Sequence, residues 1–100
     1  MIKQLQLVDN QVRVVLAGAI YVAEAATLRE TLLIYVDNGH NSFLIDFSAV
    51  DYIDSSGLGT LVAIQKRALQ QGGGVTITGL QGLVKDLFEL TRLTKVFDIQ

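Results

Sequence analysis

The chain has 100 residues, half of them hydrophobic and 18% charged, which is enough apolar material for one core and too little for two. Eight Lys and Arg against ten Asp and Glu give a net charge of −2, which excludes the broad basic surface expected of a nucleic-acid-binding protein. The absence of cysteine excludes disulfides, thiolate nucleophiles and Cys-ligated metals, and the single His40 excludes a His-rich metal site.

No segment has the pattern of a targeting or membrane-spanning sequence. The first eight residues are interrupted by Lys3, Gln4 and Gln6, so they lack the apolar stretch of a signal peptide. No apolar run approaches the roughly 20 residues that a membrane-spanning helix needs. We therefore expect a cytoplasmic protein that neither enters a membrane nor binds nucleic acid, with a monomer as the default state.

The first twenty residues indicate two strands joined by a turn. Residues 4–7 alternate between glutamine and leucine, and apolar side chains stand at every second position of residues 12–16. This period of two predicts strands with one buried face. The turn-like Asp9-Asn10-Gln11 between them predicts a hairpin, and Gly18 is expected to end the second strand.

The middle of the chain predicts a helix followed by a strand. The period becomes helical from Val22 to Asp37, and Asn38-Gly39 is a typical helix stop. The buried face is expected to hold Ala25, Leu28, Leu32, Tyr35 and Val36. The short apolar run 43–47 then predicts a strand buried on both faces, and the polar residues 48–54 are expected to form a loop.

The second half predicts two more helices around a strand. One helix should begin at Ser55 or Ser56 and end at the glycines 72–74. Its expected buried stripe is Leu58, Leu61, Val62, Ala68 and Leu69. Residues 75–79 predict a strand, and residues 96–99 a short closing segment. Between them, residues 82–90 predict a third helix with Leu83, Leu87 and Leu90 on one face.

These elements follow the order β-β-α-β-α-β-α. The βαβ units require right-handed crossovers and parallel strands. We therefore predict one α/β domain over residues 1–100. Its central sheet should be mostly parallel with an antiparallel opening hairpin, and its helices should pack on that sheet.

The most informative stretch is Asp46 to Gly59, in which a buried strand leads through Asp54-Ser55-Ser56-Gly57 into a helix. Free N–H groups and the positive end of the helix dipole make a helix start a natural anion site. The plain structural interpretation is N-capping, because Asp and Ser are favoured cap residues. One helix needs only one capping residue, so the two serines before Gly57 are more than an N-cap explains. A glycine also allows backbone or a partner to approach closely.

Other candidate sites are weaker. The glycines 72–74 lack the Gly-Lys-Ser/Thr ending of a phosphate-binding P-loop and are expected to end a helix. Asp46, Asp51 and Asp54 match no known metal loop, so we expect no metal site and no cofactor. A triad of Ser56, His40 and an aspartate lacks the Gly-x-Ser-x-Gly elbow of hydrolases. Lys66-Arg67 is expected to be a solvated basic pair on the second helix.

The string Ile53-Asp54-Ser55-Ser56-Gly57-Leu58-Gly59 resembles the signature of the STAS domain family, specifically its bacterial anti-sigma factor antagonists. The resemblance covers nearly the whole chain. It implies that Ser56 is phosphorylated by a serine protein kinase of the anti-sigma type, and that a PP2C-type serine phosphatase restores it. It also implies that the unmodified form binds that anti-sigma factor kinase and so releases a sigma factor or another effector. Asp54, Ser55, Ser56, Gly57 and Leu58 would then form the partner-binding site.

Two places depart from the family's pattern. The family often has an acidic residue soon after the glycine of the second strand, where this chain has Ala19-Ile20-Tyr21. It also often has a glycine in the turn after the third helix, where this chain has Thr91-Arg92-Leu93. The first departure bears on the choice of partner, and the second on the backbone geometry after that helix.

Three functions follow as hypotheses. The first is the phosphorylation-controlled binding protein, which is not an enzyme. The second is a STAS module that senses a small ligand or scaffolds a signalling complex without being phosphorylated. The third is a serine hydrolase or phosphoryl-transfer protein, which the missing base and oxyanion motifs disfavour.

Overall fold

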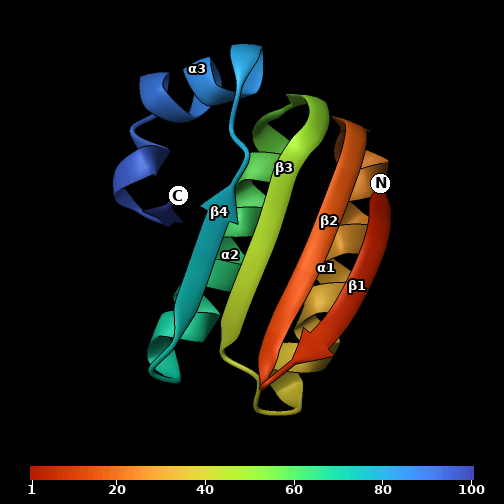
Figure 1. Cartoon of the computed structure of the whole chain (residues 1–100), viewed down its shortest axis with the longest axis vertical. Coiled ribbons are helices and arrows are strands. Elements are labelled where there is room, and N and C mark those ends of the chain that lie inside the picture. Colours follow the sequence, from red (N-terminus) through yellow and green to blue (C-terminus); the bar gives the residue numbers. More distant parts are fainter.

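The computed structural model describes all 100 residues as one mixed sheet flanked by helices (Figure 1). In chain order the elements are β1 (Ile2–Val8), β2 (Gln11–Ile20), α1 (Val22–Asp37), β3 (Ser42–Ile53), α2 (Ser55–Gln70), β4 (Gly74–Thr78), α3 (Gly82–Leu90), the 3-10 turn η1 (Leu93–Lys95) and β5 (Asp98–Ile99). The strand order is β1-β2-β3-β4-β5, with only β1 and β2 antiparallel. The predicted α/β fold with its opening hairpin is confirmed.

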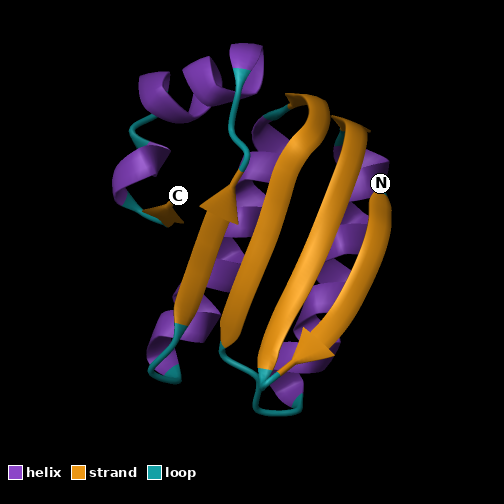
Figure 2. Cartoon of the chain, in the orientation of Figure 1, coloured by secondary structure: helices purple, strands orange, loops and turns teal.

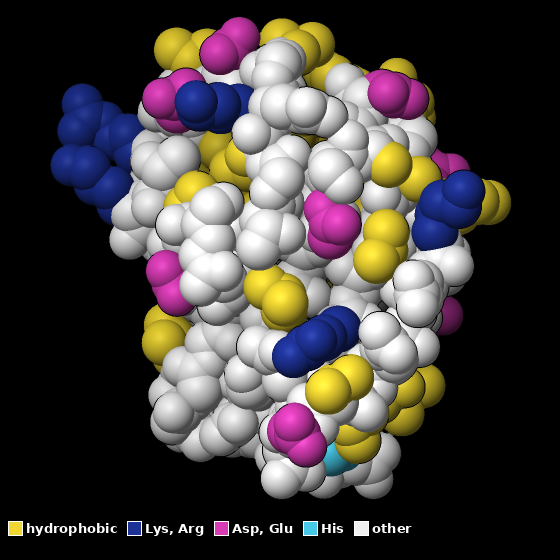
Figure 3. Space-filling view, viewed as in Figure 1, with side chains coloured by type: hydrophobic (Ala, Val, Ile, Leu, Met, Phe, Trp, Pro, Cys, Tyr) yellow, Lys and Arg dark blue, Asp and Glu magenta, His cyan; other side chains and the backbone are white.

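The core lies between the sheet and the two long helices. In Figure 2, α1 and α2 run side by side behind the strands, and the near face of β1 to β4 carries no helix. Alternate strand residues point toward the helices and are almost fully buried: Val12, Val14, Leu16, Phe43, Ile45, Phe47, Val75 and Ile77. On the near face, acidic, basic and apolar side chains are interspersed (Figure 3). None of the helices is long and apolar enough to cross a membrane.

Two strands run further than the sequence predicts. Gly18 does not end β2, because the strand continues to Ile20. Gly18 itself has a φ of +78° within the strand. The expected loop 48–54 is wrong as well, since β3 continues to Ile53. Beyond Asp46, β3 pairs only with β2, and two register shifts interrupt the alternation of buried and exposed residues. A bulged strand paired on one side has the polar sequence of a loop, which explains the error.

The helices differ from prediction mainly in which residues they bury. In α1, Ala25, Leu28, Leu32 and Val36 are buried as expected, and Tyr35 is half-buried. In α2, the buried side includes Thr60, Ile64 and Gln65, whereas Leu69 is exposed. Of the predicted α3 stripe only Leu87 packs against the core, where it is half-buried; Val84 and Phe88 are buried there, and Leu83 and Leu90 face solvent. Three leucines in nine residues form an apolar stripe, but the aromatic Phe88 buries more surface and orients the helix.

Polar and aromatic contacts fix the C-terminal third to the sheet. Phe88 meets the ring of Phe47 edge-on with centroids 5.6 Å apart, and Phe97 lies 6.1 Å from Phe88. The buried Gln65 of α2 accepts a hydrogen bond from the Val75 N–H at 2.7 Å and donates one to the Val96 carbonyl at 2.6 Å. This side chain thereby joins α2, β4 and the final turn.

The turn after α3 contains no glycine, although one of its residues has the left-handed backbone conformation that favours glycine. Arg92 adopts φ +60° and ψ +21°, in the left-handed region. Its N–H donates to the Glu89 carbonyl at 3.1 Å, so the turn closes α3 and opens η1. An L-residue pays roughly 1–2 kcal/mol for this conformation, which glycine avoids. At this departure from the family pattern, the chain therefore has an L-residue in the left-handed conformation that favours glycine.

We predict that Arg92→Gly stabilises the protein by about 0.5–1 kcal/mol, which is the relief of left-handed strain less the greater entropy of glycine in the unfolded chain. Thermal unfolding should show a midpoint a few degrees higher. Arg92→Ala is the control, because it removes the same side chain without relieving the strain. Equal midpoints for the two variants would contradict the strain at Arg92.

Candidate functional site

Asp54 begins the site by capping α2. Its backbone is extended, with φ −95° and ψ −176°, and its carboxylate accepts the Gly57 N–H at 3.1 Å. Its own N–H donates to the Ile20 carbonyl at 3.1 Å, which ties the start of α2 to the end of β2. Of the two predicted helix starts, Ser55 and Ser56, the structure has Ser55, and the capping group is the Asp54 carboxylate.

Because Asp54 supplies the cap, both serine hydroxyls are free. Ser55 is exposed and Ser56 is half-buried in the first turn of α2, and neither hydroxyl makes a hydrogen bond within the chain. No buried side-chain oxygen lacks a partner, so the unbonded Ser56 Oγ reaches solvent. The first N–H groups of a helix have no intrahelical acceptor and carry its positive dipole end. Each hydroxyl therefore sits where an added anion is electrostatically favoured.

Gly57 serves packing within the chain. It is buried, and a Cβ at this position would lie 2.5 Å from Ile53 Cγ1 and 3.0 Å from Ile20 Cγ2. The first turn of α2 therefore lies directly on the last residues of β3 and β2. The sequence analysis expected backbone or a partner to approach Gly57 closely, and in the structure the Ile53 and Ile20 side chains of the core do so. Leu58 is half-buried against that core, and its N–H donates to the Asp54 carbonyl at 3.0 Å.

Two tyrosines lie at the ends of β2 and β3, close to the start of α2, and were not predicted as site residues. Tyr21 follows β2 and begins α1, and Tyr52 stands near the end of β3, where β2 and β3 are paired as far as Ile20 and Ile53. Their ring centroids are 5.7 Å apart. The only sequence signal was the departure at Ala19-Ile20-Tyr21, which did not indicate that Tyr52 would meet it.

The structure separates the members of the hypothetical triad. His40 precedes the first residue of β3, and Ser56 follows its last, so the full length of this 12-residue strand lies between them. The His40 ring instead lies 5.8 Å from Tyr35. This geometry provides no base to activate the Ser56 hydroxyl.

The three aspartates proposed for a cation also take separate positions. Asp54 caps α2, Asp46 accepts the Ser48 N–H at 2.8 Å, and Asp51 is exposed on β3. No group of three or more His, Cys, Asp or Glu side chains is arranged to hold a metal ion.

The triple glycine ends α2 and turns the chain into β4. Gly72 has φ +85°, and the Gly73 N–H donates to the Ala68 carbonyl at 2.9 Å, as in a helix C-cap. A Cβ on Gly73 would lie 1.9 Å from the Asn41 carbonyl oxygen, so only glycine fits there. These glycines belong to the turn and lie at the opposite end of α2 from the serines.

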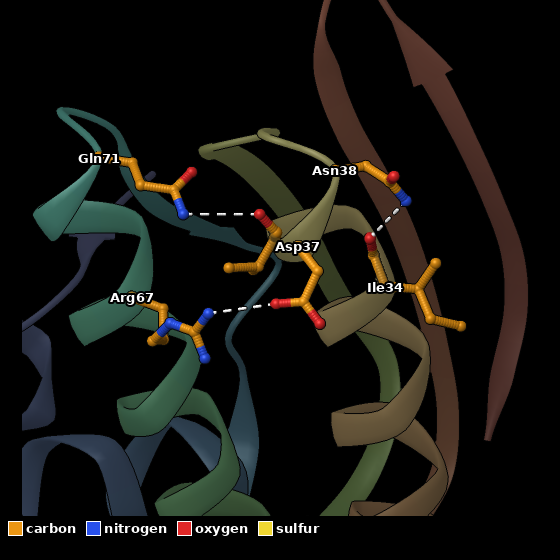
Figure 4. Close-up of polar contacts among 6 residues, drawn as sticks. Ile34, Asp37, Asn38, Arg67 and Gln71 are labelled. Atoms are coloured by element: carbon orange, nitrogen blue, oxygen red, sulfur yellow. Dashed lines mark hydrogen bonds and ion pairs between the residues drawn. The ribbon is translucent and has the colours of Figure 1, made fainter.

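The two basic residues of α2, Lys66 and Arg67, differ in their contacts: Arg67 forms an ion pair and Lys66 forms none. Arg67 Nη2 lies 3.2 Å from Asp37 Oδ1 at the end of α1, and Gln71 contacts the Val36 carbonyl beside it (Figure 4). Both charged side chains are largely exposed, so this ion pair contributes little stability. Lys66 is exposed, as predicted for a solvated face.

Comparison with known proteins agrees with this fold and motif. The family model for the STAS domain matches residues 3–100. The chain belongs to the STAS domain family. It is 35% identical over 91 residues to the anti-sigma-B factor antagonist of Bacillus subtilis, covering 91% of this chain and 83% of that protein. It is 30% identical to the anti-sigma-B factor antagonist of Listeria monocytogenes, covering 91% and 80%.

Solved structures support the same fold. The Bacillus cell-fate determinant SpoIIAA in its phosphorylated form superposes with a TM-score of 0.79 at 16% identity, covering 97% of this chain and 89% of that one. The STAS identity predicted from the motif is thus confirmed, and the relatives are anti-sigma factor antagonists. Phosphorylation of Ser56 and the partner surface around it stay predictions.

We predict opposite effects for the same substitution at two glycines of α2. Gly57→Ala should destabilise the protein by about 1–3 kcal/mol, because its methyl group overlaps Ile53 in the packed core. Gly59→Ala should stabilise it by about 0.5–1 kcal/mol, because a Cβ there meets nothing within 4 Å and alanine favours the helix. Urea unfolding measures both. A stable Gly57→Ala variant would contradict the close approach of α2 to the strand ends.

Proposed function

We propose that the protein is an anti-sigma factor antagonist whose binding is controlled by phosphorylation of Ser56. The observation that carries this proposal is the free serine hydroxyl in the first turn of α2, in a turn that Asp54 already caps. Because the fold does not use the hydroxyl, a modification can change recognition without unfolding the domain. The likeness to two anti-sigma-B factor antagonists supports the same conclusion.

The proposed partners are a serine protein kinase of the anti-sigma type and a PP2C-type serine phosphatase. The unphosphorylated form binds the kinase, which releases its sigma factor or another effector. Phosphorylation ends this binding, and the phosphatase restores it. Ser55, Ser56 and Leu58 would face the kinase, while Asp54 and Gly57 hold the turn in place. We place the protein in the cytoplasm, where such partners act on transcription.

The physical basis of the switch is electrostatic. A phosphate adds a charge of roughly −1.5 to −2 at neutral pH. At the start of α2 this charge meets free N–H groups and the positive end of the helix dipole, so the domain tolerates it. A partner surface that fits a neutral hydroxyl must instead desolvate an anion. One uncompensated charge in an interface costs about 2–5 kcal/mol, which is enough to reverse binding.

One observation favours the second function, a module that senses a small ligand. A mostly apolar cavity of about 350 Å³ opens between β1, β2 and α1, and Ile20 lines it. The same Ile20 faces Gly57, so a molecule in the cavity would lie one side chain from the serine turn. This function requires binding of the partner to be insensitive to charge at Ser56, which separates it from the first.

We predict that Ser56→Asp weakens binding to the anti-sigma factor kinase by roughly 30-fold or more, because the interface must desolvate a carboxylate. The thermal midpoint should stay equal or rise slightly, since the dipole favours a carboxylate in the first turn of α2. Titration calorimetry with a purified serine protein kinase of the anti-sigma type measures the affinity. Tight binding by Ser56→Asp would reject the switch, and unfolding of that variant would show that Ser56 is structural.

We predict that Ser56→Ala binds the kinase as tightly as the wild-type protein and accepts no phosphate. Ser55→Ala is the matched control, because it removes the neighbouring, more exposed hydroxyl and should still be phosphorylated. Phosphopeptide mapping after incubation with the kinase and ATP reads out both variants. Labelling that persists in Ser56→Ala and disappears in Ser55→Ala would move the site to Ser55.

A further inference from the structure

The turn between α1 and β3 contains the dipeptide Asn38-Gly39, which the proposed function does not use. Asn38 is the only one of the three asparagines in the chain that is followed by glycine, since Asn10 and Asn41 precede larger residues. Asn38 and Gly39 are both exposed, and they lie at the opposite end of β3 from the two serines. The dipeptide is therefore open to solvent and separate from the candidate site.

An asparagine followed by glycine can lose its side-chain amide without an enzyme. The Gly39 backbone nitrogen attacks the Asn38 Cγ, the bond from Cγ to Nδ2 breaks, and the nitrogen leaves as ammonia with the proton of the attacking N–H. Water then opens the resulting succinimide ring at either carbonyl, which leaves aspartate or isoaspartate at position 38. Water is the only co-reactant. Glycine favours the attack because it has no side chain to obstruct the ring.

The end of α1 keeps the two reacting atoms apart in the folded protein. Asn38 is the C-cap of α1, with φ −90° and ψ 9°, and at this ψ the Gly39 nitrogen is turned away from the Asn38 side chain. The Asn38 Nδ2 donates to the Ile34 carbonyl at 2.8 Å, and the Gly39 N–H donates to the Val36 carbonyl at 3.0 Å (Figure 4). The ring can therefore close only after the last turn of α1 has opened and both bonds are broken.

We propose that Asn38 is a site of spontaneous deamidation and that local opening of the last turn of α1 sets its rate. Exposed helix ends open at a lower free energy than the whole fold does, so the reaction does not wait for global unfolding. This proposal goes beyond the proposed function and does not depend on phosphorylation of Ser56.

Deamidation removes the cap that delayed it. A carboxylate has no N–H to donate to the Ile34 carbonyl. It also adds a negative charge beside Asp37, at the negative end of the α1 dipole. Isoaspartate in addition inserts a carbon into the backbone, which displaces the Gly39 N–H from its acceptor. The modified chain is therefore less stable, while the two serines at the far end of β3 stay as they are.

Peptide mapping by mass spectrometry, after incubation of the purified protein at neutral pH, measures deamidation at each asparagine. We expect Asn38 to lose its amide while Asn10 and Asn41 keep theirs. Because opening of the helix end costs free energy, the rate at Asn38 should be roughly tenfold or more lower in the folded protein than in the same chain in urea. Equal rates in the two conditions would show that the α1 cap gives no protection.

Two variants distinguish local opening from global unfolding, at a temperature well below the unfolding midpoint. Ile34→Gly weakens the last turn of α1 without changing the dipeptide, since Ile34 is 61% exposed, and it should raise the folded-state rate severalfold. Gly57→Ala is the matched control, because it destabilises the fold at the far end of β3 and should change the rate less than about twofold. If the two variants speed the reaction equally, local opening is wrong.

Asn38→Asp, which copies one of the two products, tests the effect on the fold. Its thermal midpoint should be a few degrees lower than that of the wild type. Asn10→Asp adds the same charge in the turn between β1 and β2 and should leave the midpoint unchanged. An unchanged midpoint for Asn38→Asp would contradict the capping role, and an Asn38 amide as durable in the folded protein as those of Asn10 and Asn41 would overturn the modification site. None of these measurements uses the kinase, so the proposed function can fail without affecting them.

Discussion

The contact between the first turn of α2 and the ends of β2 and β3 governs the rest of this structure. Gly57 lies so close to Ile53 and Ile20 that a Cβ would displace the Ile53 side chain, and the Asp54 N–H donates to the Ile20 carbonyl at 3.1 Å. These two contacts leave the helix start one position and one orientation. The serines, which follow the cap and precede the glycine, are therefore presented to solvent by residues that are themselves held in the core.

Because Asp54 and Gly57, and not the serines, hold the start of α2, a change at a serine can alter binding without destabilising the fold. The Asp54 carboxylate accepts the Gly57 N–H, and Gly57 allows the close packing against Ile53, so neither the cap nor the packing depends on Ser55 or Ser56. Charge added to a hydroxyl there is compensated locally by the helix start. The free-energy change appears instead in any interface that covers the turn, because desolvating an anion is expensive.

The same end of the sheet gathers the other features that bear on recognition. The pairing of β2 with β3 as far as Ile20 and Ile53 brings Tyr21 beside Tyr52, and the polar cap of α2 begins one residue later. The two serine hydroxyls and the two tyrosine rings therefore all lie at the end of the sheet where β2 and β3 stop. The opposite end, with His40 and the triple glycine, is occupied by turns whose hydrogen bonds close the helices.

The sequence alone determined the order of elements, the opening hairpin, a helix start within the serine pair and the motif that identifies the family, because these depend on local periodicity and on residues adjacent in the chain. It did not reveal that β3 continues through residues 48–53, since a bulged strand paired on one side loses the alternation that marks a strand. It placed the wrong face of α3 in the core, because only the space beside Phe47 decides that Phe88 is buried. It did not predict the pairing of Tyr21 with Tyr52 or the contact of Gly57 with Ile20, because contacts between residues 31 or 37 positions apart exist only once the parallel strands are in register.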